Sequence, residues 1–103
     1  MSEKILILGG TKEAVELARQ LFQDGHDVTT SLAGRTREPE PVAGKVRSGG
    51  FGGAIGLKDF LLNNKFTRLI DATHPFATQI SKNAVKAAEL TGVQFERYSR
   101  PAW

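Results

Sequence analysis

The sequence contains no cysteine, which excludes disulfide bonds, thiolate metal sites and cysteine nucleophiles. It also lacks a long hydrophobic run, since its longest uninterrupted apolar stretch is far too short to span a bilayer. Residues 1–4 lead straight into a strand-like segment, without the apolar stretch and cleavage site of a signal peptide. We therefore expect a cytoplasmic protein with no membrane association.

Strong charge of one sign is also missing. The chain has 14 basic and 11 acidic residues, a net charge of +3, and its basic residues are spread along the sequence. This distribution suits an anionic ligand but is not typical of a nucleic-acid-binding protein. One segment is locally richer in basic residues, which are Arg35, Arg37, Lys45 and Arg47.

Familiar catalytic and metal-binding patterns are scarce as well. His26 and His74 are the only histidines, and with Asp27 as the acid beside His26 they predict no metal cluster. The Gly-x-Ser-x-Gly turn of serine hydrolases is absent. The sequence therefore indicates neither a metal centre nor a serine-hydrolase site.

The most informative stretch is residues 5–14, Ile-Leu-Ile-Leu-Gly-Gly-Thr-Lys-Glu-Ala. Four consecutive bulky apolar residues predict a strand buried on both faces of a parallel sheet. Gly9 and Gly10 allow a sharp turn, and Thr11 can cap the helix that follows. Such a turn binds phosphate through free N–H groups, although it could also be only a tight capped turn, because the full G-x-G-x-x-G pattern is absent.

The rest of the chain alternates between strand and helix patterns. The first helix is expected over residues 12–24, with Ala14, Ala18, Leu21 and Phe22 at helical spacing and Gly25 at its end. Further helices are expected over residues 57–64 and from about residue 76 to Gly92. Strands are expected at residues 5–8, 28–32, 45–48, 66–72 and 93–98, with a loop at 33–44.

This alternation predicts an α/β fold, a doubly wound, Rossmann-like parallel sheet of about five strands with helices on both faces. Residues 1–103 fit one domain. The chain ends in a large aromatic residue, Trp103, which normally packs on a surface, so the domain could be part of a longer chain.

In such sheets, ligands bind at the carboxyl ends of the strands. The segments that follow the first four strands should therefore lie along one edge; they are residues 9–11, 31–36, 49–53 and 73–76. Arg35 follows the second strand, where an arginine accommodates the 2′-phosphate of NADP, with Ser31 and Thr36 as hydroxyl partners and no acid before Glu38. The alternative is a solvated arginine in a mixed-charge loop.

Two further segments carry open alternatives. Four of the five residues 49–53 are glycine, so the segment is either a hinge or a backbone surface against a cofactor, with Phe51 as a stacking or lid residue. His74 precedes Pro75 and is either a proton donor or, more often in this setting, a structural hydrogen-bonding residue or a ligand contact set by the backbone shape. Asp71 is expected to cap or brace the turn before it.

Taken together, these segments resemble the precorrin-6A reductase family, which includes the cobalt-precorrin-6A reductases of cobalamin biosynthesis. The resemblance covers the chain in order and spacing. Its motifs are Ile-Leu-Gly-Gly-Thr-x-Glu-Ala (7–14), Ser-Leu-Ala-Gly-Arg-Thr (31–36), Gly-Gly-Phe-Gly-Gly (49–53), Asp-Ala-Thr-His-Pro-Phe-Ala (71–77) and Arg-Pro-Ala-Trp (100–103).

The resemblance implies hydride transfer from NADPH, or NADH in some members, to one double bond of precorrin-6A, giving precorrin-6B. It also implies two α/β domains with the tetrapyrrole between them. Because family members are longer, we expect this chain to be the NADP-binding N-terminal half, inactive without the second domain that completes the site. No catalytic residue is assigned. The implied cofactor contacts are Gly9, Gly10, Thr11, Ser31, Gly34, Arg35, Thr36, Gly50, Phe51, Gly52, Gly53, Thr73, His74 and Pro75.

Two other functions were weighed. A non-catalytic nucleotide-binding or regulatory module would recruit a partner through its C-terminal end and change the fluorescence of Trp103. A sugar-nucleotide or short-chain-type enzyme is disfavoured because it needs a Tyr-x-x-x-Lys pair, and Tyr98 is the only tyrosine.

Overall fold

The computed structural model describes residues 3–32, 43–73 and 78–98. These residues form five strands and three helices in the order β1 (Lys4–Leu8), α1 (Lys12–Gln23), β2 (Asp27–Leu32), β3 (Lys45–Ser48), α2 (Gly53–Asn63), β4 (Arg68–Asp71), α3 (Thr78–Thr91) and β5 (Gln94–Arg97). The predicted alternation of strands and helices is confirmed.

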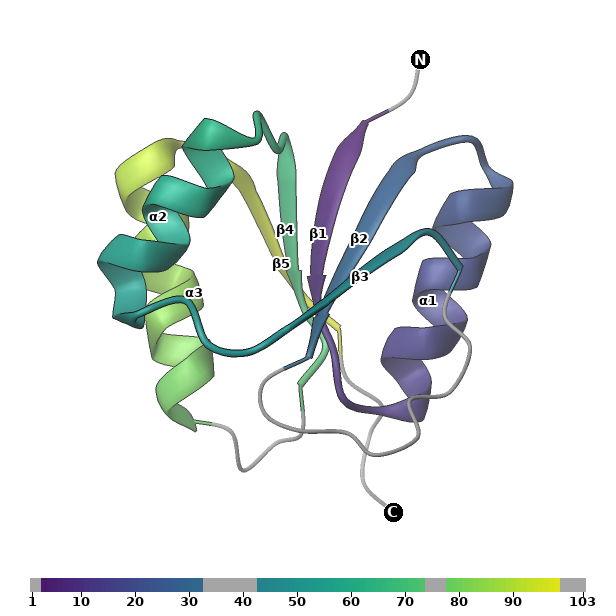
Figure 1. The fold of residues 1–103 in the computed structure, drawn as a ribbon, viewed down its shortest axis with the longest axis horizontal. Coiled ribbons are helices and arrows are strands. Elements are labelled where there is room, and N and C mark those ends of the chain that lie inside the picture. Colours follow the sequence, from purple (N-terminus) through teal and green to yellow (C-terminus); the bar gives the residue numbers. More distant parts are fainter. Residues whose placement is uncertain (1–2, 33–42, 74–77, 99–103) are drawn as a thin grey trace.

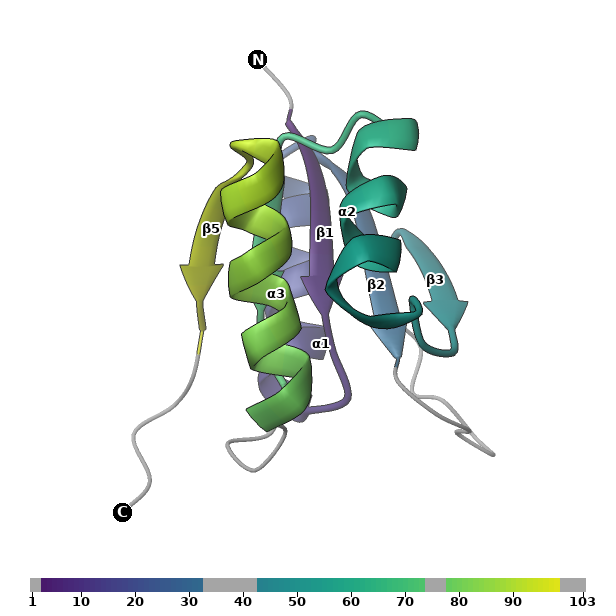
Figure 2. The ribbon, with the colours of Figure 1, turned by 90° about the vertical axis from the view of Figure 1, so that its left-hand side faces the viewer.

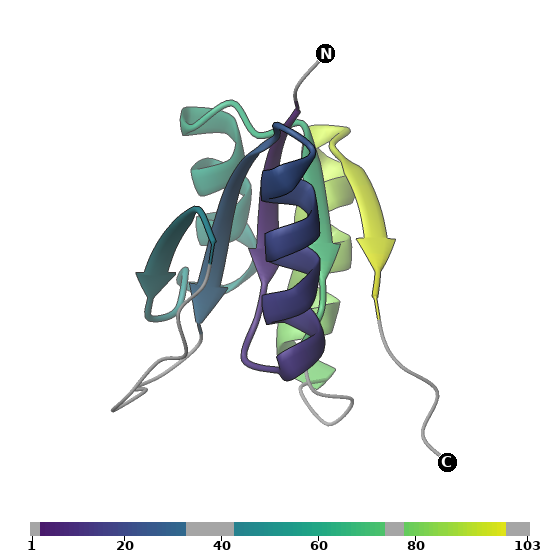
Figure 3. The same ribbon diagram turned by 90° about the vertical axis from the view of Figure 1, so that its right-hand side faces the viewer.

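The strands form one sheet in the order β3-β2-β1-β4-β5, and every pair of neighbours is parallel. Helix α1 covers one face, and α2 and α3 cover the other (Figure 1). Figure 2 shows α2 and α3 in front of the sheet, and Figure 3 shows α1 alone on the opposite face. The predicted doubly wound fold with helices on both faces is therefore confirmed.

Strand β1 divides the core because its side chains alternate between the two faces. Ile5 and Ile7 pack in the cluster beneath α1, and Leu6 and Leu8 pack in the cluster beneath α2 and α3. All four are almost completely buried, as the unbroken apolar run predicted. Burying β1 on both faces fixes the position of the turn that follows it.

Helix α1 begins at Lys12 after its cap Thr11, and Gly25 follows its end with φ +92°. Its buried face is narrower than predicted, since Phe22 is 52% exposed. The helix rests on the sheet through Ala14 and Ala18, with Leu17 and Leu21 packed beside them. Phe22 continues the i, i+4 row of Ala14 and Ala18 at the end of the helix, on the side of that row away from Leu17 and Leu21.

The start of α2 was also predicted wrongly, because the helix begins at Gly53 rather than Leu57. Gly52 caps it in the left-handed conformation, with φ +86°, which glycine adopts without strain. A Cβ atom on Gly56 would lie 1.6 Å from the carbonyl oxygen of Phe51, so the first turn packs directly on the backbone before it. Gly52, Gly53 and Gly56 together therefore allow the helix to start here, at the end of the glycine-rich segment.

The other differences lie at element ends. Strands β4 and β5 are shorter than the predicted 66–72 and 93–98, while Phe66 is buried just before β4. Gly92 follows α3 with φ +75°, as predicted, and the expected start of that helix near residue 76 lies outside the described residues.

Candidate functional site

The carboxyl ends of all five strands lie at one edge of the sheet, because the strands are parallel. Strand β1 pairs with β2 on one side and with β4 on the other, so the direction of winding reverses between β1 and β4. In doubly wound sheets, ligands bind in the crevice at such a reversal. The site is therefore sought where β1, β2 and β4 end.

The turn after β1 is closely packed. A Cβ atom on Gly9 would lie 2.7 Å from Cγ2 of Thr30, so only glycine fits there without a shift of its neighbour. Gly10 has φ +111° and open space around its Cα atom. Thr11 Oγ1 accepts a hydrogen bond from the N–H of Ala14 at 3.1 Å and donates one to the carbonyl of Ala72 at 2.8 Å. The threonine thus caps α1 and ties its start to the end of β4.

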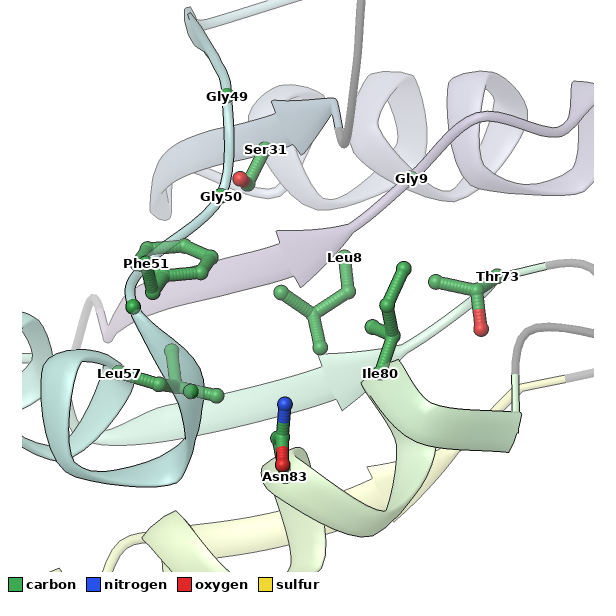
Figure 4. Close-up of a pocket in the computed structure, with 12 residues that line it drawn as sticks. Leu8, Gly9, Ser31, Gly49, Gly50, Phe51, Leu57, Thr73, Ile80 and Asn83 are labelled. Carbon is green, nitrogen blue, oxygen red and sulfur yellow. The ribbon is translucent and has the colours of Figure 1, made fainter.

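A pocket of about 160 Å³ opens at this edge (Figure 4). Residues that follow β1, β3 and β4 line it together with Ser31 near the end of β2, so the described parts of the four predicted segments meet here. Its apolar walls come from β1, α2 and α3 and from the glycine-rich segment, and its polar side chains come from β2, from the turn after β4 and from α3. The lining residues are Leu8, Gly9, Ser31, Gly49, Gly50, Phe51, Gly52, Gly53, Leu57, Thr73, Ile80 and Asn83.

Arg47 on β3 holds the glycine-rich segment to the end of β2. Its Nη1 donates to Ser31 Oγ at 2.9 Å and to the carbonyl of Gly49 at 3.1 Å, and its Nη2 donates to the carbonyl of Gly50 at 3.3 Å. The guanidinium carbon lies 4.0 Å from the centroid of the Phe51 ring. Arg47 therefore fixes one wall of the pocket and places a positive charge beside Ser31.

The buried carboxylate of Asp71 organises the opposite side. Its Oδ1 accepts hydrogen bonds from the N–H of Thr73 at 3.1 Å and from the Thr73 hydroxyl at 2.6 Å. Its Oδ2 accepts from the Ser81 hydroxyl at 2.6 Å and lies 3.8 Å from Nη1 of Arg97. These contacts confirm that Asp71 braces the turn after β4, and they fix the start of α3 relative to that turn.

The predicted site residues divide into three groups. Seven line the pocket: Gly9, Ser31, Gly50, Phe51, Gly52, Gly53 and Thr73. Gly10 and Thr11 form the adjoining turn. Five lie outside the described residues, and their placement stays a prediction: Gly34, Arg35, Thr36, His74 and Pro75.

Six residues of this region were not among the predicted site residues: Leu8, Arg47, Gly49, Leu57, Ile80 and Asn83. Leu8 and Gly49 lie in the predicted first strand and glycine-rich segment, and Leu57 and Ile80 lie in predicted helices. Arg47 was grouped with the other basic residues of its segment, and only its closeness to the glycine-rich run signalled a special place. Asn83 carried no signal, because its position at the pocket depends on how α3 packs.

Two searches within the described residues are negative. They contain no group of three or more His, Cys, Asp or Glu side chains that could hold a metal ion. Among the helices they form, none has the length and hydrophobicity needed to cross a membrane.

The parallel five-stranded sheet, its winding order and the pocket at its carboxyl edge define an α/β protein of Rossmann-like fold. The family model described as precorrin-6x reductase CbiJ/CobK matches residues 4–103. The chain therefore belongs to the precorrin-6x reductase family, which is a family of oxidoreductases.

Individual relatives agree. The chain is 54% identical over 101 residues to a precorrin-6A reductase of a Sinorhizobium species, covering 97% of this chain and 39% of the relative. The structure of CobK precorrin-6A reductase matches with a TM-score of 0.93 at 46% identity, covering 100% of this chain and 41% of that one. The chain thus spans about 40% of the length of these relatives.

A more distant structure has the same fold. The Bordetella bronchiseptica enzyme WbmG, solved in complex with NAD, matches with a TM-score of 0.69 at 26% identity, over 94% of this chain and 37% of that enzyme.

Proposed function

We propose that this chain binds NADPH as the cofactor-binding part of a precorrin-6A reductase. The observation that carries the proposal is the pocket at the switch point between β1 and β4, in a chain that belongs to a reductase family. The NAD complex of WbmG supports a nicotinamide dinucleotide as the ligand of this type of sheet.

The residues at the edge fit such a cofactor. Gly9 lets the turn pack against Thr30, and Gly10 leaves the backbone open to a close approach. The start of α1 directs N–H groups at the same point, where a pyrophosphate would be stabilised. The apolar pocket beside this turn fits an aromatic ring. The chemistry of this edge therefore suits a molecule with both anionic and aromatic parts.

Selectivity for NADPH over NADH is assigned to the end of β2. We propose that Arg35, with Ser31, Gly34 and Thr36, binds the 2′-phosphate. The Arg47 guanidinium beside Ser31 adds positive charge at this corner. NADH is the alternative cofactor, as the resemblance implies for some members of the family.

The glycine-rich segment and the turn after β4 would contact the parts of the cofactor other than its phosphate groups. Gly50, Gly52 and Gly53 have no side chains, so the cofactor can contact their backbone directly, and Phe51 provides a ring for stacking. We propose that Thr73, His74 and Pro75 border the nicotinamide end. Asp71 holds this turn in place through its bonds to Thr73.

When bound, NADPH would be the hydride source for reducing one double bond of precorrin-6A or its cobalt form, with the hydride going to one carbon and a proton to the other. The residues of this chain orient the cofactor and shield it from water. No side chain is assigned as the proton donor.

The macrocycle would bind between this domain and an additional domain of the same protein. The relatives are more than twice as long as the matched region, which supports an additional domain that completes the tetrapyrrole site. On this proposal, residues 1–103 form one NADP-binding domain, which binds cofactor without turning over substrate by itself. A purely regulatory module is not favoured, because the relatives are named as reductases.

The test is calorimetric titration of the chain with NADPH and NADH at low salt. Wild-type protein is expected to bind NADPH in the micromolar range and NADH more weakly. Arg35→Ala should weaken NADPH much more than NADH, since only NADPH carries the 2′-phosphate. Equal losses for both cofactors would contradict the assignment of Arg35, and no binding of either by wild type would contradict the proposed cofactor site.

A further inference from the structure

The pocket at the sheet edge is lined mainly by apolar groups, with Leu8, Phe51, Leu57 and Ile80 as its large side chains. Its volume of about 160 Å³ is smaller than the roughly 300–1,000 Å³ typical of sites for whole small molecules. It is therefore suited to one ring system rather than to an entire dinucleotide.

One polar side chain from α3 interrupts the apolar lining. Figure 4 shows the nitrogen end of the Asn83 amide directed toward the space between Leu8, Leu57 and Ile80. The other end of the amide is held, because Gln79 Nε2 donates to Asn83 Oδ1 at 3.1 Å. This bond orients the amide so that Nδ2 is the atom offered to a ligand.

No hydrogen bond joins Asn83 Nδ2 to another residue in the described part of the chain. An amide N–H is a strong donor, and in an apolar surrounding it gains most from an acceptor that enters with the ligand. A flat heteroaromatic ring with unprotonated nitrogens meets both requirements, since its faces are apolar and its edge accepts hydrogen bonds.

We propose that this pocket receives the adenine ring of the cofactor and that Asn83 Nδ2 donates a hydrogen bond to a ring nitrogen. This inference rests on the proposed binding of NADPH and names a residue that recognises its adenine. Asparagine pairs with adenine through the same donor in nucleic-acid recognition, where its amide contacts N6 and N7.

The position of the pocket selects adenine over nicotinamide. Ser31 ends β2, the strand whose end binds the ribose of the adenosine half in doubly wound sheets. The glycine-rich segment between β3 and α2 forms another side. The pocket therefore opens beside the end of β2 and the glycine-rich segment, on the face covered by α2 and α3, and Thr73 after β4 lies on its side toward the proposed nicotinamide end.

The test compares Asn83→Asp with Lys82→Gln. Each substitution lowers the net charge by one, but Lys82 is the neighbouring exposed residue and does not line this pocket. The probes are NADPH and its two halves, adenosine 2′,5′-bisphosphate and reduced nicotinamide mononucleotide, titrated by calorimetry. The aspartate keeps the shape of the side chain while replacing the donor with an acceptor.

Asn83→Asp is expected to lower the affinities for NADPH and for the bisphosphate by the same factor, about 3- to 10-fold for a lost hydrogen bond. The nicotinamide mononucleotide should be unaffected, and Lys82→Gln should change no affinity by more than about twofold. In wild-type protein, the side-chain amide NMR signal of Asn83 should shift on adding the bisphosphate. That measurement needs no variant and so does not depend on the folding of Asn83→Asp.

Unchanged affinities in Asn83→Asp, together with an unmoved amide signal, would overturn the adenine assignment while leaving NADPH binding intact. A selective loss of the nicotinamide mononucleotide would overturn it as well. If the wild-type protein bound the bisphosphate but not NADPH, the adenine pocket would be supported and the proposed function would be contradicted. Binding of none of the three probes would overturn both.

Discussion

The guanidinium carbon of Arg47 lies 4.0 Å from the centroid of the Phe51 ring, so the two side chains of the glycine-rich wall stack on each other. The same guanidinium donates hydrogen bonds to Ser31 Oγ and to two backbone carbonyls of the segment 49–50. A planar group with several fixed donors can satisfy all of these contacts at once, whereas a lysine ammonium cannot.

Arg47→Lys keeps the charge but removes the fork of donors and the stacked plane. We expect it to lower the free energy of unfolding by about 1–2 kcal/mol. A hydrogen bond and an exposed cation–π contact each make a net contribution of about 0.5–1.5 kcal/mol. NADPH should bind several-fold more weakly because the pocket wall is no longer held. Urea unfolding and calorimetric titration measure the two effects.

Lys45→Arg on the same strand is the matched control, because Lys45 is exposed and does not line the pocket. It should leave both the free energy of unfolding and the NADPH affinity unchanged. If Arg47→Lys behaved like this control, the guanidinium would not hold the glycine-rich segment.

A second prediction concerns Asp71, which is 1% exposed and accepts hydrogen bonds from Thr73 and Ser81 on its two oxygens. In Asp71→Asn, one of these oxygens becomes an N–H₂ group that faces a donor. We expect a loss of about 1–3 kcal/mol in the free energy of unfolding, the usual result of leaving a buried polar group unsatisfied. Urea unfolding checks this.

Asp59→Asn removes a carboxylate whose side chain is 58% exposed and whose ion pair with Lys58 is solvated. It should change stability by less than about 0.5 kcal/mol. Equal stability of the two asparagine variants would mean that the Asp71 carboxylate is not needed to brace the turn after β4.

Local patterns in the sequence were sufficient to predict the order of strands and helices and the turn after the first strand. The run Ile5–Leu8 is apolar without interruption because β1 is buried on both faces, and that pattern is visible without tertiary structure. The turn residues Gly9 to Thr11 were likewise recognisable, since a glycine pair and a capping threonine follow directly from local geometry.

The contacts of Arg47 and Asn83 could not be predicted in this way. Arg47 reaches Ser31 because β2 and β3 pair in the register that places these two residues opposite each other. Asn83 reaches the pocket because α3 packs beside α2 and against β4, and no local pattern encodes that arrangement. The roles of Arg35 and His74 lie outside the described residues and stay predictions.

The start of α2 shows why the prediction for that helix was wrong, and it gives a third prediction. The helix was predicted to begin at Leu57, after the glycine-rich segment 49–53, yet Gly53 and Gly56 lie inside it. The missing side chain of Gly56 lets the helix approach the Phe51 carbonyl. In Gly56→Ala, the new Cβ atom would lie 1.6 Å from that oxygen, and the oxygen belongs to the backbone, which cannot rotate away.

We therefore expect Gly56→Ala to destabilise the chain by about 1–3 kcal/mol, as overpacking does, although alanine favours helices. Gly50→Ala is the matched control, because nothing lies within 4 Å of its added Cβ atom and its φ is not in the left-handed region. The control should keep its stability in urea unfolding. A Gly56→Ala variant as stable as wild type would show that α2 does not start against the Phe51 backbone, and the pocket wall formed by residues 49–53 would then have to be placed differently.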